Sequence, residues 1–139
     1  MNRFVLDASI GLAWFVDDPV PQPAVDAWRS LQQGYRAVVP SLWILEMANG
    51  LAMAERRAAL SPSYIDRCLR DIEVMLVSTL ERAAASMTIR QAFNSASAFR
   101  LTAYDAVYLE TARNEHLPLA TLDRALKNAA VAAGVTLFP

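Results

Sequence analysis

The segment from Leu101 to Asp123 reads LTAYDAVYLETARNEHLPLATLD and organises the rest of the chain. Thr102 opens an expected helix whose first turn carries Asp105. A short apolar run, residues 117–120, then has the composition of a β-strand, and Asp123 follows it at the start of another helix. A strand between two helices is typical of a parallel α/β sheet, so this segment indicates the fold class and two acidic positions.

The same alternation of short apolar runs and helical patterns covers the whole chain. The expected strands are residues 3–6, 37–39, 76–78, 117–120 and 135–138. The expected helices are residues 10–16, 24–31, 42–57, 62–75, 83–98, 102–115 and 123–133. This order predicts a single α/β domain over residues 1–139, with helices on both faces of a parallel sheet. Right-handed crossovers would bring the carboxyl ends of all strands to one edge.

Composition limits the classes of protein to which the chain belongs. Apolar residues make up 55% of the 139 positions, which favours a folded core over disorder. No uncharged stretch approaches the roughly 20 residues of a membrane span, and Asp7 interrupts the first apolar run too early for a signal peptide. We therefore expect a cytoplasmic protein without a membrane partner. The single Cys68 excludes an internal disulfide, and the net charge of −1 does not indicate a general nucleic-acid binder.

Four carboxylates stand out by their positions, although each also has a purely structural explanation. Asp7 ends the first strand, where it suits a turn or a helix cap, and Ser9 is expected to cap the helix that follows. Asp105 has the spacing of a capping box, and Asp123 lies where the helix dipole favours an acid. Glu46 lies among apolar residues of a long helix, so it is either solvent-facing or a buried charge that needs a partner.

Taken together, the four acids predict a metal site. Asp7 and Asp123 follow strands, so both are expected at the carboxyl edge of the sheet, where open α/β sheets place their sites. Glu46 lies one helical turn beyond the second strand, so it can reach the same edge. Asp105 at a helix N-terminus can point there too, although no strand directly precedes it. Carboxylates without His or Cys favour Mg²⁺ or Mn²⁺, which would neutralise their mutual repulsion. Such a cluster activates water and stabilises charge on a scissile phosphate.

Other catalytic arrangements are poorly represented. His116 is the only histidine and lies in a polar turn, which gives no basis for a Ser-His-Asp triad. The chain has four glycines and no glycine-rich phosphate loop, which argues against a nucleotide-binding ATPase. Candidate cations for substrate phosphates are Arg3, Arg56, Arg57, Arg100 and Arg124.

The motifs that carry these residues resemble the PIN-domain family and, within it, the VapC-type toxins of toxin–antitoxin pairs. The similar segments are VLDAS at residues 5–9, WILEMAN at 43–49, LTAYDAVYL at 101–109 and PLATLDRAL at 118–126. The resemblance implies a three-layer α/β/α sandwich and a metal-dependent ribonuclease with Mg²⁺ or Mn²⁺ as cofactor. It implies a homodimer inhibited by an antitoxin protein. The acidic positions match Asp7, Glu46, Asp105 and Asp123, and the polar neighbours that orient them match Ser9 and Thr121.

Two alternatives remain open from the residues alone. The chain is also compatible with a binding module whose acids cap helices or hold a structural ion, and whose docking surface includes Trp43, Met47 and Met53. A phosphatase or another nuclease would use the same metal chemistry. Only the family resemblance separates these hydrolases from a ribonuclease.

Overall fold

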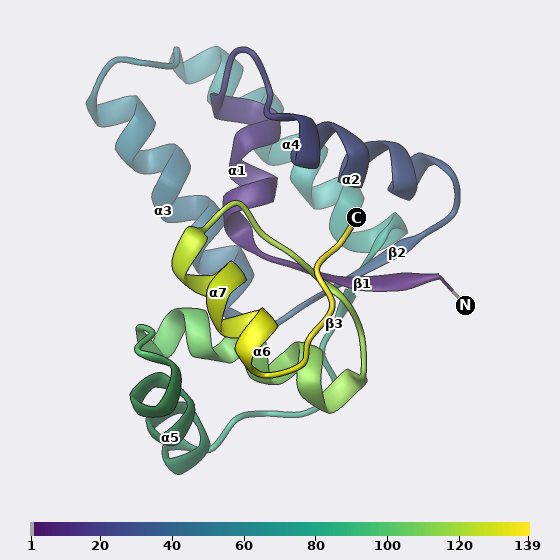
Figure 1. The fold of residues 1–139 in the computed structure, drawn as a ribbon. Helices are drawn as coiled ribbons and strands as arrows, with labels where there is room; N and C mark the ends of the chain where they lie inside the picture. Colours follow the sequence, from purple (N-terminus) through teal and green to yellow (C-terminus); the bar gives the residue numbers. More distant parts are fainter. Residues whose placement is uncertain (1) are drawn as a thin grey trace.

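The computed structural model describes residues 2–139 and contains a parallel sheet of four strands (Figure 1). These strands are β1 (Arg3–Leu6), β2 (Arg36–Val39), β3 (Leu80–Arg82) and β4 (Leu119–Ala120). Their spatial order is β3-β2-β1-β4, and all neighbouring strands pair in parallel. The predicted α/β fold around a parallel sheet is confirmed.

Helices cover both faces of this sheet. In the described chain they are α1 (Ala8–Val16), α2 (Gln22–Gln32), α3 (Leu42–Arg56), α4 (Pro62–Ser78), α5 (Ile89–Phe99), α6 (Ala103–Glu115) and α7 (Arg124–Ala132). The chain adds β2 and then β3 on one side of β1, and it later adds β4 on the other side of β1. Right-handed crossovers therefore place α1–α4 on one face and α5–α6 on the other, with α7 beside α6 (Figure 1). No helix within residues 2–139 combines the length and the apolar character needed to span a membrane.

This topology determines where a site forms. Because α1, α3 and α7 begin directly after β1, β2 and β4, their N-termini lie at the carboxyl edge of the sheet. The N-terminus of α6 lies at the same edge, since its other end leads into β4. The topological switch point of the sheet, where the order of the strands reverses, therefore lies between β1 and β4. In open α/β sheets, ligands bind at the carboxyl edge beside such a reversal.

Helices α1 and α3 pack closely, which fixes the turn of α3 that carries Glu46. A Cβ atom added at Gly11 would lie 2.9 Å from Met47 Sδ and 3.1 Å from Trp43 Cζ2. Trp43 is fully buried and Met47 nearly so, whereas Met53 is exposed. The prediction of a docking surface on this helix is therefore wrong, because two of the three side chains belong to the core.

Two of the expected strands are also wrong. Residues 76–78 continue α4, because buried side chains such as Ile72 and Met75 keep the helical spacing almost to the end of that helix. The third strand is instead the short β3 that follows. Residues 135–138 form only an isolated parallel bridge to β4, which is two residues long and offers little backbone to pair with.

The helix expected over residues 83–98 begins six residues later, as α5. Thr88 and Gln91 form a complete capping box there, with hydrogen bonds of 3.1 and 3.0 Å. These reciprocal bonds satisfy backbone N–H groups at the new start of the helix. The residues before Thr88 are thereby left as the connection from β3.

Candidate functional site

Asp7 lies at the carboxyl end of β1, where its backbone N–H donates to the Ala120 carbonyl of β4 over 3.0 Å. Its side chain is almost fully buried. The Oδ2 atom accepts hydrogen bonds from Ser9 Oγ and Thr121 Oγ1, both at 2.6 Å. Both hydroxyls bind the same oxygen, and no side chain within residues 2–139 donates a hydrogen bond to Oδ1. The two hydroxyl groups thus orient the carboxylate, and the backbone of Ser9 also stabilises its charged form.

The hydroxyl groups of Ser9 and Thr121 connect the segments that follow β1 and β4. Ser9 Oγ accepts from the Leu122 N–H, and Thr121 Oγ1 accepts from the Asp123 N–H, each over 3.0 Å. The expectation that Ser9 caps a helix is wrong, because α1 already begins at Ala8. A hydrogen bond to a carboxylate is stronger than one to a neutral backbone group, so the hydroxyl binds Asp7 instead.

Thr121→Val is expected to lower the free energy of unfolding by about 2 kcal/mol, since it removes one donor from a buried carboxylate and one acceptor from a backbone N–H. Thr111→Val is the matched control. Thr111 is also buried, but its hydroxyl donates only to the Val107 carbonyl of its own helix, at 2.7 Å. Its loss should cost less than about 1 kcal/mol. Urea denaturation of both variants measures the difference, and equal losses would contradict the special role of Thr121.

Asp123 and Asp105 lie at the N-termini of α7 and α6. Asp123 Oδ2 accepts from the Leu126 N–H at 2.8 Å, so this carboxylate does cap its helix. At α6 the Asp105 N–H donates to Thr102 Oγ1 at 3.1 Å, but the described helix lacks the reciprocal bond of a capping box. The carboxylate of Asp105 is half-buried but does not cap α6, so helix capping does not account for an acid at this position.

Glu46 lies near the start of α3 and is half-buried. Its Oε1 accepts a 2.6 Å hydrogen bond from the hydroxyl of Tyr108, a fully buried side chain. Tyr108 follows Asp105 by three residues, so α6 presents both side chains on one face. Sequence analysis did not identify Tyr108, although this spacing was the available signal.

The charges of neighbouring acids act on three of the four carboxyl groups. Burial raises the pKa of Asp7, and the charge of Asp123 raises it further. Burial also raises the pKa of Glu46, with added effects from Asp7 and Asp105. The pKa of Asp105 is raised by burial first and then by the charges of Asp123 and Asp7. The charges of acids that follow β1 and β4, or lie on α6, therefore raise the pKa of carboxyl groups from other elements.

These side chains do not form a closed ligand set as they stand. Among residues 2–139, no group of three or more His, Cys, Asp or Glu side chains is positioned to hold a metal ion. The donor chemistry nevertheless fits a divalent cation, because the acids supply only oxygen ligands and a cation would relieve their repulsion. Coordination by three of them requires side-chain rotation toward a common point.

The candidate cations are unevenly placed. Arg3 begins β1 at the opposite edge and pairs with Glu81 at 3.2 Å and Glu115 at 3.5 Å, so we exclude it as a substrate contact. Arg100 and Arg124 are exposed near the starts of α6 and α7. Arg56 lies ten residues beyond Glu46 on α3, about 15 Å along the helix axis.

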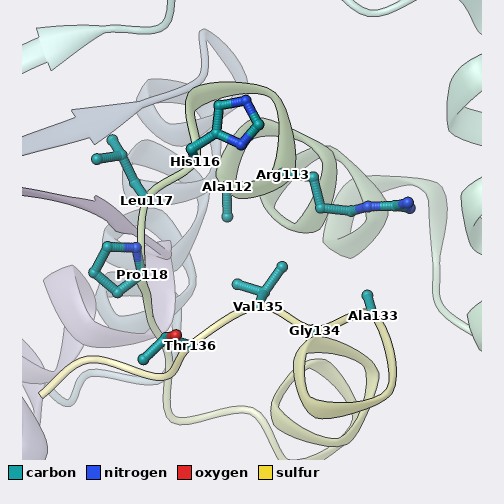
Figure 2. A pocket seen from close by; sticks show the side chains of 9 residues that line it. All are labelled: Ala112, Arg113, His116, Leu117, Pro118, Ala133, Gly134, Val135 and Thr136. Atoms are coloured by element: carbon teal, nitrogen blue, oxygen red, sulfur yellow. The ribbon is translucent and has the colours of Figure 1, made fainter.

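A separate pocket of about 390 Å³ lies at the far end of α6 (Figure 2). Its walls come from the C-terminal turn of α6, including Arg113 and His116, and from the segment after α7. His116 is exposed, as expected for a surface residue. The acids lie at the helix N-termini, so this pocket is not part of their site.

Comparison with known proteins agrees with this architecture. The PIN domain profile matches residues 4–132, which include all four acidic positions. The crystal structure of PAE2754 from Pyrobaculum aerophilum has a similar fold, with a TM-score of 0.66 and 24% sequence identity over 92% of this chain and 79% of that chain. None of the curated proteins searched matches the chain. The chain belongs to the PIN-domain family, whose members are generally metal-dependent nucleases.

Proposed function

We propose that this protein is a metal-dependent endoribonuclease whose metal ligands are Asp7, Glu46, Asp105 and Asp123. The observation that carries the proposal is the placement of these acids on four separate segments at one edge of the sheet, where the charges of Asp7, Asp105 and Asp123 raise the pKa of neighbouring carboxyl groups. Keeping like charges together is costly unless a cation balances them. Helix N-termini at the same edge also favour a phosphate.

Each residue has a distinct part in the proposed site. Asp7, oriented by Ser9 and Thr121, and Asp105 would supply oxygens to the main ion, while Glu46 and Asp123 would complete its shell or hold a second one. Bound Mg²⁺ or Mn²⁺ lowers the pKa of a water ligand and stabilises negative charge on a phosphate.

The biological role that we propose is that of a toxin in a toxin–antitoxin pair. The motifs around the four acids support it through their resemblance to VapC-type toxins. On this proposal the protein is a single cytoplasmic domain, forms a homodimer, and has an antitoxin protein as its partner. Its substrate is a cellular RNA.

Cleavage mapping on total cellular RNA tests the proposed activity. Purified protein is incubated with Mg²⁺ or Mn²⁺, with and without EDTA, and new 5′ ends are sequenced. Discrete cuts that disappear with EDTA would support a metal-dependent nuclease and identify its RNA. Folded protein that binds Mn²⁺ but makes no cuts would contradict the proposed ribonuclease activity.

Tyr108→Phe is expected to weaken the apparent affinity for Mn²⁺ and the rate of RNA cleavage by about 10- to 100-fold, because Glu46 loses the hydroxyl that orients it. Tyr64→Phe is the matched control, since Tyr64 donates a 2.8 Å hydrogen bond to the Phe15 carbonyl away from the acids. Cleavage rates are measured as Mn²⁺ is titrated. The same kinetics in both variants would show that Tyr108 has only a structural role.

A further inference from the structure

A groove of about 490 Å³ crosses the carboxyl ends of β2 and β3. One wall is the face of α6 that carries Tyr104 and Val107, and the other walls follow the two strands, from Ser41 to Leu42 and from Arg82 onward. A volume of this size lies within the range of about 300–1,000 Å³ typical of ligand pockets.

The groove lies beside two of the acids along the backbone, although none of the four acids lines it. Tyr104 in its wall directly precedes Asp105, and Leu42 lies one helical turn before Glu46 on α3. Arg82 ends β3, two strands away from β1, which places its backbone about 10 Å from that of Asp7. An extended RNA strand whose phosphate lies at the acids therefore reaches the groove with its next nucleotides.

We propose that this groove binds an unpaired nucleotide beside the scissile phosphate, with its base stacked on Tyr104 and its phosphate bound to Arg82. The inference rests on the proposed ribonuclease function. Tyr104 is 62% exposed, so its ring is open to a stacking partner beside the half-buried carboxylate of Asp105. A base can stack on such a ring only after it leaves its own stack, so the groove selects single strands or loops.

Arg82 supplies a positive charge for RNA phosphates, which the four acids cannot provide. It is exposed, and no carboxylate in the described chain lies within ion-pair distance of it. Its planar guanidinium group suits two oxygens of one phosphate. Sequence analysis did not select Arg82, because β3 has no apolar run that would have indicated a strand ending there.

RNA binding tests the groove independently of catalysis. The full chain is first inactivated by Asp105→Asn, so that it does not cut the RNA. Its affinity is then measured by fluorescence anisotropy, in the presence of Mg²⁺, for a short labelled single-stranded RNA of mixed sequence and for the duplex of that RNA. Adding Tyr104→Ala should weaken single-strand binding about tenfold and leave duplex binding unchanged, while Tyr104→Phe should bind normally. Adding Arg82→Gln should reduce the slope of log affinity against log salt by about 0.7, and Arg113→Gln at the opposite edge should not.

RNA cleavage is measured in parallel, with Mn²⁺, on proteins that keep Asp105. This second measurement distinguishes an error in the proposed groove from an error in the proposed nuclease activity. Cleavage together with normal RNA binding by Tyr104→Ala and Arg82→Gln would overturn the groove and leave the nuclease intact. Absence of both cleavage and RNA binding in folded protein would overturn both proposals. Variants that change the sedimentation of the protein but not its RNA affinity would reassign the groove to a contact between copies of the chain.

Discussion

Asp105→Asn is expected to reduce metal-dependent RNA cleavage by more than about a hundredfold. Replacing a partner that only orients a metal ligand typically costs about 10- to 100-fold, so replacing a ligand should cost more. Asn keeps the shape of the side chain but removes the charge that holds the cation. Initial rates on the mapped RNA, with saturating Mn²⁺, measure the effect.

The same substitution should leave the protein at least as stable as the wild type. Burial and the charges of Asp123 and Asp7 raise the pKa of Asp105, so the folded protein disfavours the charged carboxylate. The backbone bond from Asp105 to Thr102 Oγ1, which caps α6, does not involve the carboxylate and is retained. Lost cleavage together with an unchanged or higher melting temperature would distinguish chemistry from unfolding.

Asp71→Asn is the matched control, since Asp71 is an exposed acid on α4, a helix that carries none of the four acids. It should retain both cleavage and stability. Wild-type cleavage by Asp105→Asn would remove Asp105 from the mechanism. Cleavage products that persist with EDTA in both variants would indicate a contaminating nuclease.

The fold class is predictable from sequence because β1, β2 and β4 occupy apolar runs that end at a polar residue or a proline. The strand β3 is not, since Leu80-Glu81-Arg82 buries only its first residue and has no apolar pattern. Its place in the sheet depends on parallel pairing with β2, which lies more than 40 residues earlier in the chain. Pairing at such a distance leaves no local signal.

The acidic site is predictable only in part, for a similar reason. Asp7 and Asp123 follow strands, so topology alone places them at one edge. Of the two hydroxyl bonds that orient Asp7, the one from Thr121 reaches a residue 114 positions earlier, and the bond from Tyr108 reaches Glu46 across 62 positions. Ser9 shows the ambiguity, because a hydroxyl after a strand is equally typical of a helix cap.

In EDTA, the acids are expected to make the protein less stable as the pH rises above about 4. The pKa values of Asp7, Glu46 and Asp105 are raised from 3.8, 4.5 and 3.8, chiefly by burial. Each group therefore binds its proton more tightly in the folded protein than in the unfolded chain. Raising the pH from the unfolded pKa through the folded one removes that advantage, so the free energy of unfolding falls. Melting curves of wild type and Asp7→Asn across this range isolate the effect, which should be smaller in Asp7→Asn.

Mn²⁺ should reverse this loss at neutral pH. A ligand at a hundred times its dissociation constant stabilises the folded state by about 2.7 kcal/mol, which corresponds to a rise in Tm of roughly 10 °C for a domain of this size. The rise should shrink near pH 4, where protons compete for the carboxylates, and should disappear in Asp7→Asn. A rise of equal size in Asp7→Asn would place the ion elsewhere on the protein. No rise in the wild type, at any Mn²⁺ concentration that supports cleavage, would mean that the four acids do not form the metal site.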